Sequence, residues 1–568
     1  MNEDYKKLSN DDLIQLLKDR DSKLNKISKQ IPYGLVWEDK DETVVSDFRT
    51  KTPVIKINKS KDIEDKNQPT NYLIEGENLH VLKILETTHS ESIDVIYIDP
   101  PYNTGNKDFI FNDEYVDKED LFRHSKWVSF MEKRLKIAKT LLKPSGKIIV
   151  SIDDNEVFNL KLLLDQIFNE NNFIACLPTV MNLKGNQDQF AFAGTHEYTL
   201  VYTKDKNKSQ FNDMPLNEQE IKEDWKEDEF GLWKEGRYLK FTGKNASREK
   251  QPTLYFPVWV KKDGTDLSTK EVKGWDKILP ITIKGGKPQE MSWSWSKKKF
   301  EEEKFNIIIK GSSPDWSFKK KQRPNIGEVP SKRPKSLFYK PEYSSTNGAT
   351  QLEGIFGDRV FDYPKPLGLI EDLLLICGNK DSLILDFFAG TGTTGHAILN
   401  LNKNDAGCRK FILVSNNENK IVENVTYSRI SKAINGYKNR TTNKNVEKLG
   451  GALKKLDIHY VENENTDYSN YEISKNLSDT ICFKEETYEV VKKNNYFEIY
   501  KNEKGKYTVI IFDFSDIEKI PSLIKEKDAE LTIYKYQLAA DYDEYVIEEI
   551  FQNNTITDQI DIPSFYTQ

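Results

Sequence analysis

The sequence predicts an α/β fold built around a largely parallel β-sheet. Short apolar runs typical of buried parallel strands, at 93–98 and within 147–154, alternate with amphipathic helical segments. A further strand at 383–387 runs into a glycine-rich turn and another helix. Strands that alternate with helices in this way indicate a parallel sheet covered by helices.

The order of the segments divides the 568 residues into five parts. A helix is predicted within residues 1–30, because Ser9 and Asp12 form a capping box ahead of the run LIQLLKDRDSKL. Strand–helix alternation stops after about Met181 and resumes near 340. The five parts are an N-terminal helical arm (1–60), the first half of an α/β core (61–180), an inserted basic domain (181–340), the second half of the core (341–440) and a small acidic α/β domain (441–568).

Charge is distributed unevenly along the chain, although its net value is -7. Residues 231–340 contain 26 lysines and arginines against 12 aspartates and glutamates, and six of the nine tryptophans lie between Trp233 and Trp316. From residue 441 to the end, acidic residues exceed basic ones by 10. A basic segment of this kind favours a surface that binds a polyanion, and a solvated lysine-rich insert without a ligand is the alternative.

The cysteines indicate a reducing environment. Cys176, Cys377, Cys408 and Cys482 lie far apart in sequence and offer neither metal-ligand spacing nor a disulfide framework. We therefore expect a cytoplasmic location. No apolar run approaches the roughly 18 residues of a membrane span, and the first residues lack the apolar core of a secretory signal.

The segment DFFAGTGTTGHA (386–397) places three glycines directly after an apolar strand. Glycine lets the backbone turn sharply into a helix and approach a ligand closely. This arrangement is typical of Rossmann-like cofactor sites, and a tight turn without a ligand is the alternative. No lysine follows the last glycine, so the segment does not match a phosphate-binding P-loop.

The segment IDPPYNTG (98–105) ends another apolar strand with chemistry suited to an amine. Two consecutive prolines, Pro100 and Pro101, fix the backbone and remove two N–H donors. The Asp99 carboxylate and the Pro100 carbonyl can accept hydrogen bonds from the exocyclic amine of a base, which makes that amine more nucleophilic, and Tyr102 can stack on the base. We interpret these four residues as an amine-methylation site, with a proline-rich strand exit and a surface tyrosine as the alternative.

Together, DPPY and FAGTG resemble the motifs of the amino-methyltransferases of DNA. The catalytic motif here precedes the cofactor loop, with the basic insert between them, and this circularly permuted order resembles the β class of adenine-N6 methyltransferases. The resemblance implies a Rossmann-like S-adenosylmethionine-dependent methyltransferase sheet with both motifs at the carboxyl ends of adjacent strands. It makes 61–180 the catalytic half, 341–440 the cofactor-binding half and 181–340 a target-recognition domain.

Further segments, GENLHVLKIL, DPPYNTGNKDF, RHSKWVSFMEKRL and SIDDNE, resemble the modification subunits of type III restriction–modification systems. The resemblance covers roughly 70–200 and 340–435 and, more loosely, the C-terminal segment. It implies double-stranded DNA as substrate, a homodimer of this chain and a helicase–nuclease restriction subunit as partner. The C-terminal domain and the N-terminal helix are candidate interaction surfaces.

The resemblance also assigns the cofactor site, for S-adenosyl-L-methionine. The segment FDYPKPLGLIEDLL (361–374) resembles the helix that closes over the methionine part of the cofactor. The family usually has an acidic residue for the ribose at the end of the next strand, which here reads FILVSNNENK, with Ser415 or Asn416 at the expected place. We name Glu418 for this contact, with Asn416 or Asn417 as alternatives. The other cofactor residues by motif match are Asp386, Phe388, Ala389, Gly390, Gly392 and Thr393.

Methylation of a base in duplex DNA requires the base to be flipped into the site, at a cost of a few kcal/mol. The amine then takes the methyl group directly, so neither a catalytic cysteine nor a metal is expected. The insert would supply phosphate contacts and base readout, with Arg237, Arg248, Arg323 and Arg333 as candidates.

Some residues leave two interpretations open. They are strand-end acids that border the pocket or cap a helix (Asp153, Asp154), basic residues for phosphate or a plain surface (His124, Lys126), aromatics beside the base or in loop packing (Phe109, Phe111, Tyr115), and tryptophans of the insert core or the DNA contact (Trp293, Trp295).

Four other functions compete with adenine methylation. Cytosine-N4 methylation uses the same geometry, and aspartate rather than serine before the prolines favours adenine by family resemblance. An RNA substrate is disfavoured by the large basic insert, and a non-catalytic DNA-recognition subunit is disfavoured by the intact DPPY and FAGTG motifs. An NAD-dependent dehydrogenase would leave DPPY unexplained.

Overall fold

The computed structural model divides the chain into two compact units, Met1–Asn212 with Lys335–Gln568, and Asp213–Pro334. The helix predicted within 1–30 lies outside the described residues, apart from Lys18. The residues that the structure describes are 18, 37–40, 42–185, 191–216, 218–243, 245–284, 286–324, 330–463, 467–526, 529–536, 547, 550–551 and 555–561.

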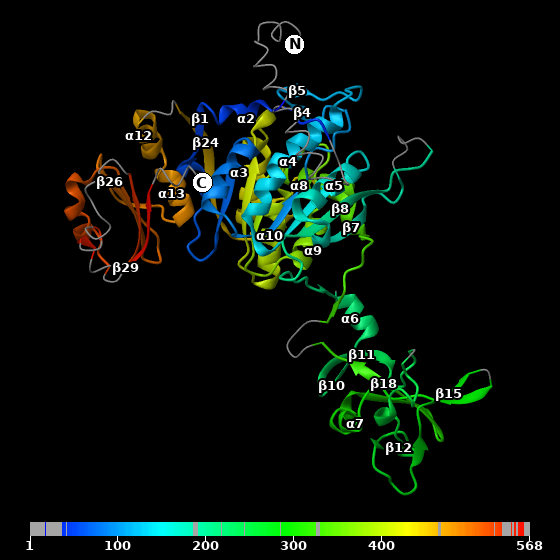
Figure 1. Cartoon of the computed structure of the whole chain (residues 1–568). Helices are drawn as coiled ribbons and strands as arrows, with labels where there is room; N and C mark the ends of the chain where they lie inside the picture. The colour runs from blue at the N-terminus through cyan, green and yellow to red at the C-terminus, as the bar shows by residue number, and fades with distance from the viewer. Residues whose placement is uncertain are drawn as a thin grey trace. The chain divides into compact units, whose positions relative to one another are not determined.

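A nine-stranded sheet forms the centre of the first unit (Figure 1). Its strands are β1 (Lys51–Ile57), β2 (Thr70–Glu75), β3 (Ile93–Ile98), β6 (Leu142–Ile152), β7 (Phe173–Val180), β8 (His196–Thr203), β20 (Leu383–Asp386), β21 (Lys410–Ser415) and β24 (Ala452–Glu462). In space they follow the order β1-β24-β2-β21-β20-β3-β6-β8-β7. The strands from β24 to β6 are parallel to one another, whereas β1 and β8 run antiparallel to their neighbours. The predicted α/β fold class is confirmed.

Helices cover both faces of this sheet, because right-handed crossovers that leave the centre in opposite directions place their helices on opposite sides. The helices α3 (Asn78–Thr88), α4 (Arg123–Leu141) and α5 (Val157–Phe168) pack side by side. The helices α9 (Leu367–Cys377), α10 (Thr393–Asp405) and α11 (Tyr427–Asn435) form a second group, preceded by α8 (Ser345–Phe356). Central strands covered in this way are apolar along their whole length, and β3 is buried at Val95, Ile96 and Ile98.

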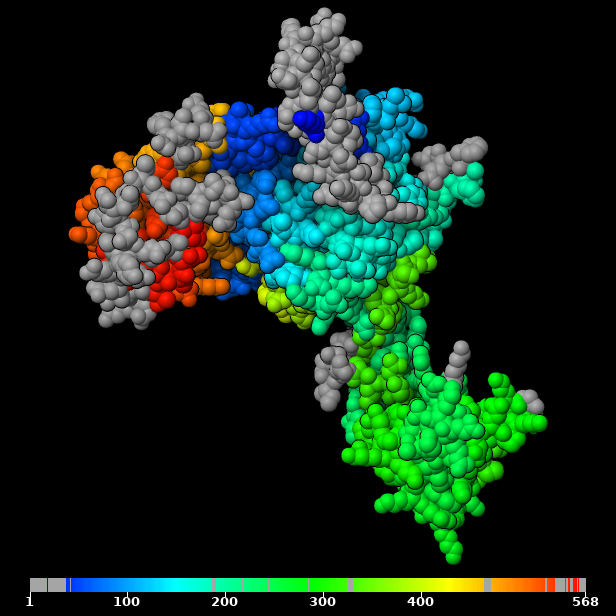
Figure 2. Space-filling model, in the orientation of Figure 1, coloured from blue at the N-terminus to red at the C-terminus, as the bar shows by residue number. Residues whose placement is uncertain are grey.

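The C-terminal residues form a second, five-stranded sheet within the first unit. Its strands are β25 (Glu489–Lys493), β26 (Phe497–Lys501), β27 (Lys506–Ile511), β28 (Glu530–Lys535) and β29 (Thr555–Asp561), and α12 (Asp467–Asn476) and α13 (Ser478–Glu485) precede them. The helix α13 contacts β1, so the C-terminal part lies beside the N-terminal part, as the orange and blue surfaces of Figure 2 show.

The structure differs from the predicted domain boundaries in three places. The sequence assigns 1–60 to a separate arm, 181–340 to the insert and 441–568 to a separate domain, yet β1, β8 and β24 are all strands of the central sheet. Each of them pairs with a strand that is distant in sequence or lies beyond a long connection, and local periodicity does not reveal such pairing.

The second unit is the insert, and it consists mainly of β-strands together with short helices. It contains a four-stranded sheet of β10 (Lys226–Asp228), β11 (Gly231–Tyr238), β18 (Asp315–Gln322) and β17 (Ile307–Ser312), and a three-stranded sheet of β13 (Leu267–Ser268), β12 (Val258–Val260) and β14 (Asp276–Ile278). It also contains the hairpin β15 (Ile281–Lys284) and β16 (Lys287–Glu290), the paired strands β9 (Met214–Pro215) and β19 (Ser331–Lys332), and the helices α6 (Glu218–Asp224) and α7 (Lys297–Glu302). Aromatic side chains, including Trp293, Phe300 and Phe318, form its core.

Across the described part of the chain, no helix combines the length and apolar character that a membrane crossing requires.

Candidate active site

The loops that follow β3 and β20 lie side by side at the carboxyl edge of the central sheet. The two strands pair in parallel, with Val95 opposite Ile384 and Ile96 opposite Leu385. From β20 the chain continues to β21 on one side, and from β3 it continues to β6 on the other. A topological switch point therefore lies between the two loops, and ligands of open α/β sheets bind in the crevice at such a point.

Buried side chains hold the loop after β3. The indole Nε1–H of Trp127 on α4 donates a hydrogen bond of 2.7 Å to the carbonyl oxygen of Pro101. Asn103 has a positive φ of 57°, and its Nδ2 donates at 2.6 Å to Oε1 of the buried Glu156. Among the described residues, none donates a hydrogen bond to the Pro100 carbonyl oxygen. The loop is thus fixed through Pro101 and Asn103, while the carbonyl of the buried Pro100 accepts no hydrogen bond from the described residues.

Four polar side chains meet at this loop. Asp99 and Tyr102 belong to the loop, Glu197 lies on β8, and Lys365 lies between α8 and α9. The hydroxyl of Tyr102 donates to Oδ1 of Asp99 and to Oε2 of Glu197, at 3.0 Å in each case. The Nζ of Lys365 donates to the Tyr102 hydroxyl at 2.5 Å and to Glu197 Oε2 at 2.6 Å, and it lies 3.4 Å from Asp99 Oδ1. Lys365 and Glu197 are residues that sequence reasoning missed.

Burial changes the acid–base properties of this cluster. Burial raises the pKa of Asp99 above its usual range, although the Lys365 ammonium opposes the change. Burial by itself would lower the pKa of Lys365, but the carboxylates of Asp99 and Glu197 outweigh it and raise that pKa. Lys365 therefore remains charged, and the cluster combines one cation with two carboxylates.

Asp386 shapes the glycine-rich loop after β20. It is buried, its Oδ1 accepts a hydrogen bond of 3.0 Å from the Phe388 amide, and its Oδ2 accepts one of 2.6 Å from the Thr394 hydroxyl. Burial raises the pKa of Asp386 to about 7. The carboxyl group ties the start of the loop to the first turn of α10 and faces the loop itself.

The glycines of this loop face two different environments. Gly390 has a φ of 48°, and a side chain there would meet only the Phe388 carbonyl oxygen, at 3.9 Å. Gly392 has a φ of 77°, and a Cβ there would lie 3.1 Å from Thr426 Cγ2. Gly390 thus opens outward and leaves room for a ligand against the backbone, whereas Gly392 allows close packing on the neighbouring segment.

The inner side of the loop is held by a buried arginine. Arg429 on α11 donates hydrogen bonds to the hydroxyls of Thr391 and Thr393, at 3.0 and 2.7 Å. The Thr393 side chain is therefore engaged with the protein.

Ala389 is also held within the loop. It is 6% exposed, and its amide donates to the carbonyl oxygen of Val414 at 3.1 Å.

The residues named for the ribose follow β21. Glu418 is exposed, and the Tyr115 hydroxyl donates to its Oε1 at 3.5 Å. Asn416 is also exposed. The Oδ1 of Asn417 accepts a hydrogen bond of 3.1 Å from the Val422 amide and so serves the local turn. Glu418 and Asn416 remain the candidates whose side chains face solvent.

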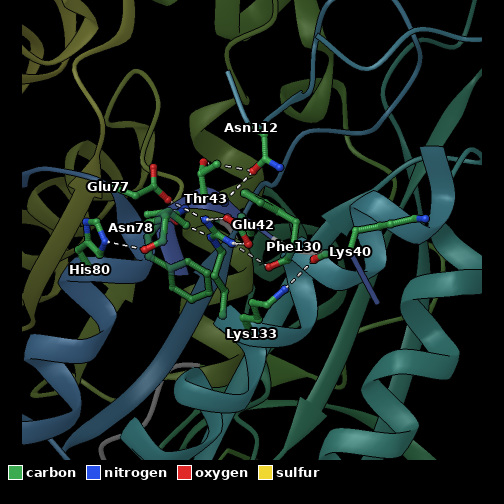
Figure 3. Close-up of polar contacts among 12 residues, drawn as sticks. Lys40, Glu42, Thr43, Glu77, Asn78, His80, Asn112, Phe130 and Lys133 are labelled. Carbon is green, nitrogen blue, oxygen red and sulfur yellow. Dashed lines mark hydrogen bonds and ion pairs between the residues drawn. The ribbon is translucent and has the colours of Figure 1, made fainter. Parts of the chain in front are cut away.

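A buried arginine on α4, which the sequence did not single out, contacts Glu42, Glu77 and Asn78, which are labelled in Figure 3. Arg134 is 1% exposed, and its guanidinium donates to Glu42 at 2.8 and 3.2 Å and to Glu77 at 2.7 Å. Its Nε donates to Oδ1 of Asn78 at 2.5 Å, and Asn78 Nδ2 donates to the carbonyl oxygen of Phe387 at 3.1 Å. The network links the segment before α2 (Thr43–Asp47) to the glycine loop.

The same arginine reaches the loop through aromatic packing. Its guanidinium lies 3.6 Å from the ring centroid of Phe130, and that ring is 5.9 Å from the ring of Phe388. Glu77 and Asn78 follow β2 after one residue, Gly76, and the end of β2 lies beside the end of β21. A polar pair after a buried strand was the sequence signal that could have identified this network.

One arginine assigned to DNA has a structural role in the second unit. Arg323 is tied to the Asp228 carboxylate by two hydrogen bonds of 2.8 and 2.7 Å, and its Nε donates to Asn306 at 2.7 Å. Its side chain is 13% exposed. The donors of Arg323 are therefore engaged within the insert, and its contact with DNA stays a prediction.

The other basic candidates are more accessible. Arg237 and Arg333 are exposed and form no ion pair with any described residue. Arg248 is paired with Glu290 at 2.9 Å and remains half-exposed. Lys126 pairs with Asp120 at 2.6 Å.

Asp153 and His124 are engaged in local contacts. Asp153 accepts hydrogen bonds from the backbone and side-chain nitrogens of Asn155, at 2.9 and 2.8 Å, and caps the turn before α5. Asp154 is exposed. His124 Nδ1 lies 2.7 Å from Glu156 Oε1, so it belongs to the group that holds the loop after β3.

The aromatic candidates are mainly packing residues. Phe109 and Phe111 are buried at 1% and 7% exposure, whereas Tyr115 is exposed. Trp293 lies in the core of the insert and donates its indole N–H to a backbone carbonyl at 2.8 Å. Trp295 packs on the same core.

The fold and site define a class of protein. A carboxylate, a prolyl carbonyl, a tyrosine ring and an outward-facing glycine loop flank the switch point of one α/β sheet. Such a combination forms the active site of an S-adenosyl-L-methionine-dependent methyltransferase that acts on amino groups of bases. The model of the DNA methylase family matches residues 93–425, and the chain belongs to this family.

Several proteins are similar to this chain over much of its length. The type III restriction-modification enzyme EcoPI Mod subunit of Escherichia phage P1 is 38% identical over 478 residues, which cover 77% of this chain and 73% of that protein. The type II methyltransferase M.KpnI of Klebsiella pneumoniae is 33% identical over 343 residues, 60% of this chain and 79% of that protein. The StyLTI Mod subunit of Salmonella typhimurium is 31% identical over 373 residues, 62% and 53% of the two chains.

Proposed function

We propose that this protein is the modification subunit of a type III restriction–modification system and methylates N6 of an adenine within a specific sequence of double-stranded DNA. The observation that carries the proposal is the position of Asp99 and Pro100 beside the glycine loop, at one switch point, with no described residue donating to the Pro100 carbonyl. The similarity to Mod subunits, at 38% identity for EcoPI, supports the type III assignment.

The base-binding residues act on a flipped adenine. The Asp99 carboxylate and the Pro100 carbonyl accept the two hydrogens of the N6 amine, which directs its lone pair away from the ring. Tyr102 stacks on the base and offsets part of the unstacking cost, by about 1–3 kcal/mol. Pro101 serves the same site by fixing the turn, since its carbonyl is held by Trp127.

The residues present fit S-adenosyl-L-methionine, which supplies an electrophilic methyl group when bound. Gly390 leaves open space against the loop backbone. Phe388 offers a partly exposed ring, and Glu418 and Glu77 place carboxylates at the ends of adjacent strands, where ribose hydroxyls and an adenine amine need acceptors. Asp386 and Thr393 would act indirectly, by shaping the loop.

The proton balance also falls to Asp99. When N6 gains a methyl group it must release one proton, and a carboxylate bonded to that amine is the nearest acceptor. The raised pKa of Asp99 makes it a better proton acceptor than an exposed aspartate.

The second unit would act as the target-recognition domain. This unit, Asp213–Pro334, contains 26 basic against 20 acidic side chains, and the exposed Arg237, Arg248 and Arg333 would supply phosphate or base contacts. A homodimer of the chain and a restriction subunit as partner form part of this proposal, as does a cytoplasmic location, where the cell's DNA is found.

Transfer of a radiolabelled methyl group tests the proposal. The purified protein is incubated with labelled S-adenosyl-L-methionine and bacterial DNA, and the DNA is digested to nucleosides and separated. We expect the label in N6-methyldeoxyadenosine. Label in N4-methyldeoxycytidine would overturn the choice of base, and no label in DNA would overturn the activity of the isolated chain.

A further inference from the structure

Lys365 lies inside the proposed base pocket, although it comes from the segment between α8 and α9. Its side chain is 10% exposed, and its Nζ lies 4.8 Å from the ring centroid of Tyr102. Pro364 and Pro366 on either side restrict its backbone. A Cβ at Gly348 of α8 would lie 2.2 Å from the Pro364 carbonyl oxygen, so the helix and this segment are in close contact.

The Lys365 ammonium has three hydrogens to donate, and three oxygens lie at unequal distances from its Nζ. Glu197 and Tyr102 are close, at 2.6 and 2.5 Å, and Asp99 is farther away, at 3.4 Å. Asp99 is also the oxygen that the amine of an entering base would take. One ammonium hydrogen is thus held weakly at the place where a base arrives, while the other two keep the side chain in position.

The position of a donor beside an acceptor matches one edge of adenine. That edge presents the N6 amine as donor and, next to it, the ring nitrogen N1 as acceptor. We propose that Lys365 donates a hydrogen bond to N1 of the flipped adenine while Asp99 accepts one from N6, so that the pair selects a base with an amine beside an unprotonated ring nitrogen. This inference rests on the proposed function.

Guanine and thymine are excluded by the same pair. Each of them presents a carbonyl oxygen beside a ring N–H, which would set oxygen against the Asp99 carboxylate and an N–H against the Lys365 ammonium. A buried site that leaves such groups unpaired rejects a ligand strongly. Cytosine presents an amine beside N3 and is not excluded, so its rejection depends on pocket size or on the insert.

Glu197 is a positioning residue for this pair. It contacts Lys365 and Tyr102 and holds both from β8. It also keeps the ammonium charged, together with Asp99, so that the donor is present throughout the neutral pH range.

Duplexes in which the target adenine is replaced by 1-deazaadenine test the inference. This base keeps the N6 amine but has C–H in place of N1. The duplex carries the sequence that the protein methylates, with thymine opposite the target base in every case. We compare wild type, Lys365→Met, which keeps the length of the side chain without its charge, and Lys365→Arg, which keeps donors.

For wild type we expect kcat/KM to fall about 10- to 100-fold with 1-deazaadenine, because the charged hydrogen bond to N1 can no longer form. For Lys365→Met we expect a low kcat/KM that is the same for both bases, and for Lys365→Arg a partial preference for adenine. An equal penalty in wild type and Lys365→Met would overturn the inference. Cofactor binding by calorimetry checks that each variant is folded.

Binding provides a second readout if Lys365→Met has no measurable turnover. The dissociation constants of the two duplexes are then measured with S-adenosylhomocysteine present. We expect wild type to prefer adenine about 10-fold and Lys365→Met to show no preference. An unchanged preference would contradict the inference. Absence of methyl transfer by wild type to unmodified DNA would instead overturn the proposed function itself.

Discussion

The indole nitrogen of Trp127 donates a hydrogen bond of 2.7 Å to the carbonyl oxygen of Pro101. Through this contact the helix α4 fixes the turn that presents Asp99 and the Pro100 carbonyl to the crevice. The turn is thereby oriented before a base enters, and preorganised acceptors of this kind lose little energy to rearrangement during the reaction.

The first prediction concerns this hydrogen bond. Trp127→Phe keeps an aromatic ring but removes the donor, so we expect kcat for methyl transfer to fall about 10-fold with cofactor affinity unchanged. Trp293→Phe is a matched control, because Trp293 also donates to a backbone carbonyl, at 2.8 Å, within the insert. Equal values of kcat for the two variants at saturating DNA would contradict the role of Trp127.

The second prediction concerns Asp99. Asp99→Ala should lower methyl transfer by at least about 100-fold, because it removes an acceptor that contacts the reacting amine. Affinity for S-adenosyl-L-methionine, measured by calorimetry, should change little. Asp153→Ala removes an acid at the end of the adjacent strand, whose carboxylate is engaged with Asn155, and serves as control. Loss of cofactor binding in Asp99→Ala would show that Asp99 contacts the cofactor rather than the amine of the target base.

The third prediction concerns Asp386 and pH. Burial raises its pKa to about 7 from 3.8, so between these pH values the folded protein holds a proton that the unfolded chain has released. The contribution of Asp386 to the free energy of unfolding is therefore fully present below about pH 4 and falls as pH rises towards 7. Asp386→Asn does not titrate, so its stability relative to wild type should increase from pH 5 to pH 7 in urea unfolding. A difference that does not vary with pH would refute the shift.

The fourth prediction concerns the basic insert. Replacing both Arg237 and Arg333 by glutamine should weaken DNA binding and reduce the slope of log K against log salt concentration, by about 0.9 for each phosphate that is no longer neutralised. Arg323→Gln should mainly destabilise the insert, since Arg323 is bonded to Asp228. The slope is obtained from DNA affinities measured at several salt concentrations. An unchanged slope in the double variant would show that Arg237 and Arg333 do not contact DNA phosphates.

The fifth prediction concerns Arg134. Arg134→Met leaves Glu42 and Glu77 without their cation in a buried site, so we expect a decrease of about 3–5 kcal/mol in stability. Affinity for the cofactor should also fall, because the arginine no longer orients Asn78 towards the glycine loop. Lys133→Met, at the preceding position of α4, is the control and should change neither quantity greatly. Unaltered cofactor affinity in Arg134→Met would show that the Arg134 network does not support cofactor binding.

The two motifs and the class of fold could be predicted because their signals are local. An apolar strand, a turn residue and a helix cap are all read within a dozen residues, and the parallel sheet then requires that DPPY and the glycine loop share an edge. The predicted family is confirmed by the match of the DNA methylase model.

The remaining features depend on contacts between distant segments. Glu197 and Lys365 lie 168 residues apart in the chain and meet only because β8 returns to the central sheet. The predicted insert boundary missed β8, since a long connection separates it from β7. Arg323 looked like the other arginines of the insert, because the sequence does not show that Asp228 would bind it.

Expression in a methylation-deficient bacterium, followed by sequencing that detects modified bases, tests the central claim most directly. We expect N6-methyladenine at one recurrent sequence motif in the genomic DNA, and its absence from cells that express Asp99→Ala. N4-methylcytosine at the motif, or a genome without any modified base although the folded protein binds its cofactor, would contradict it.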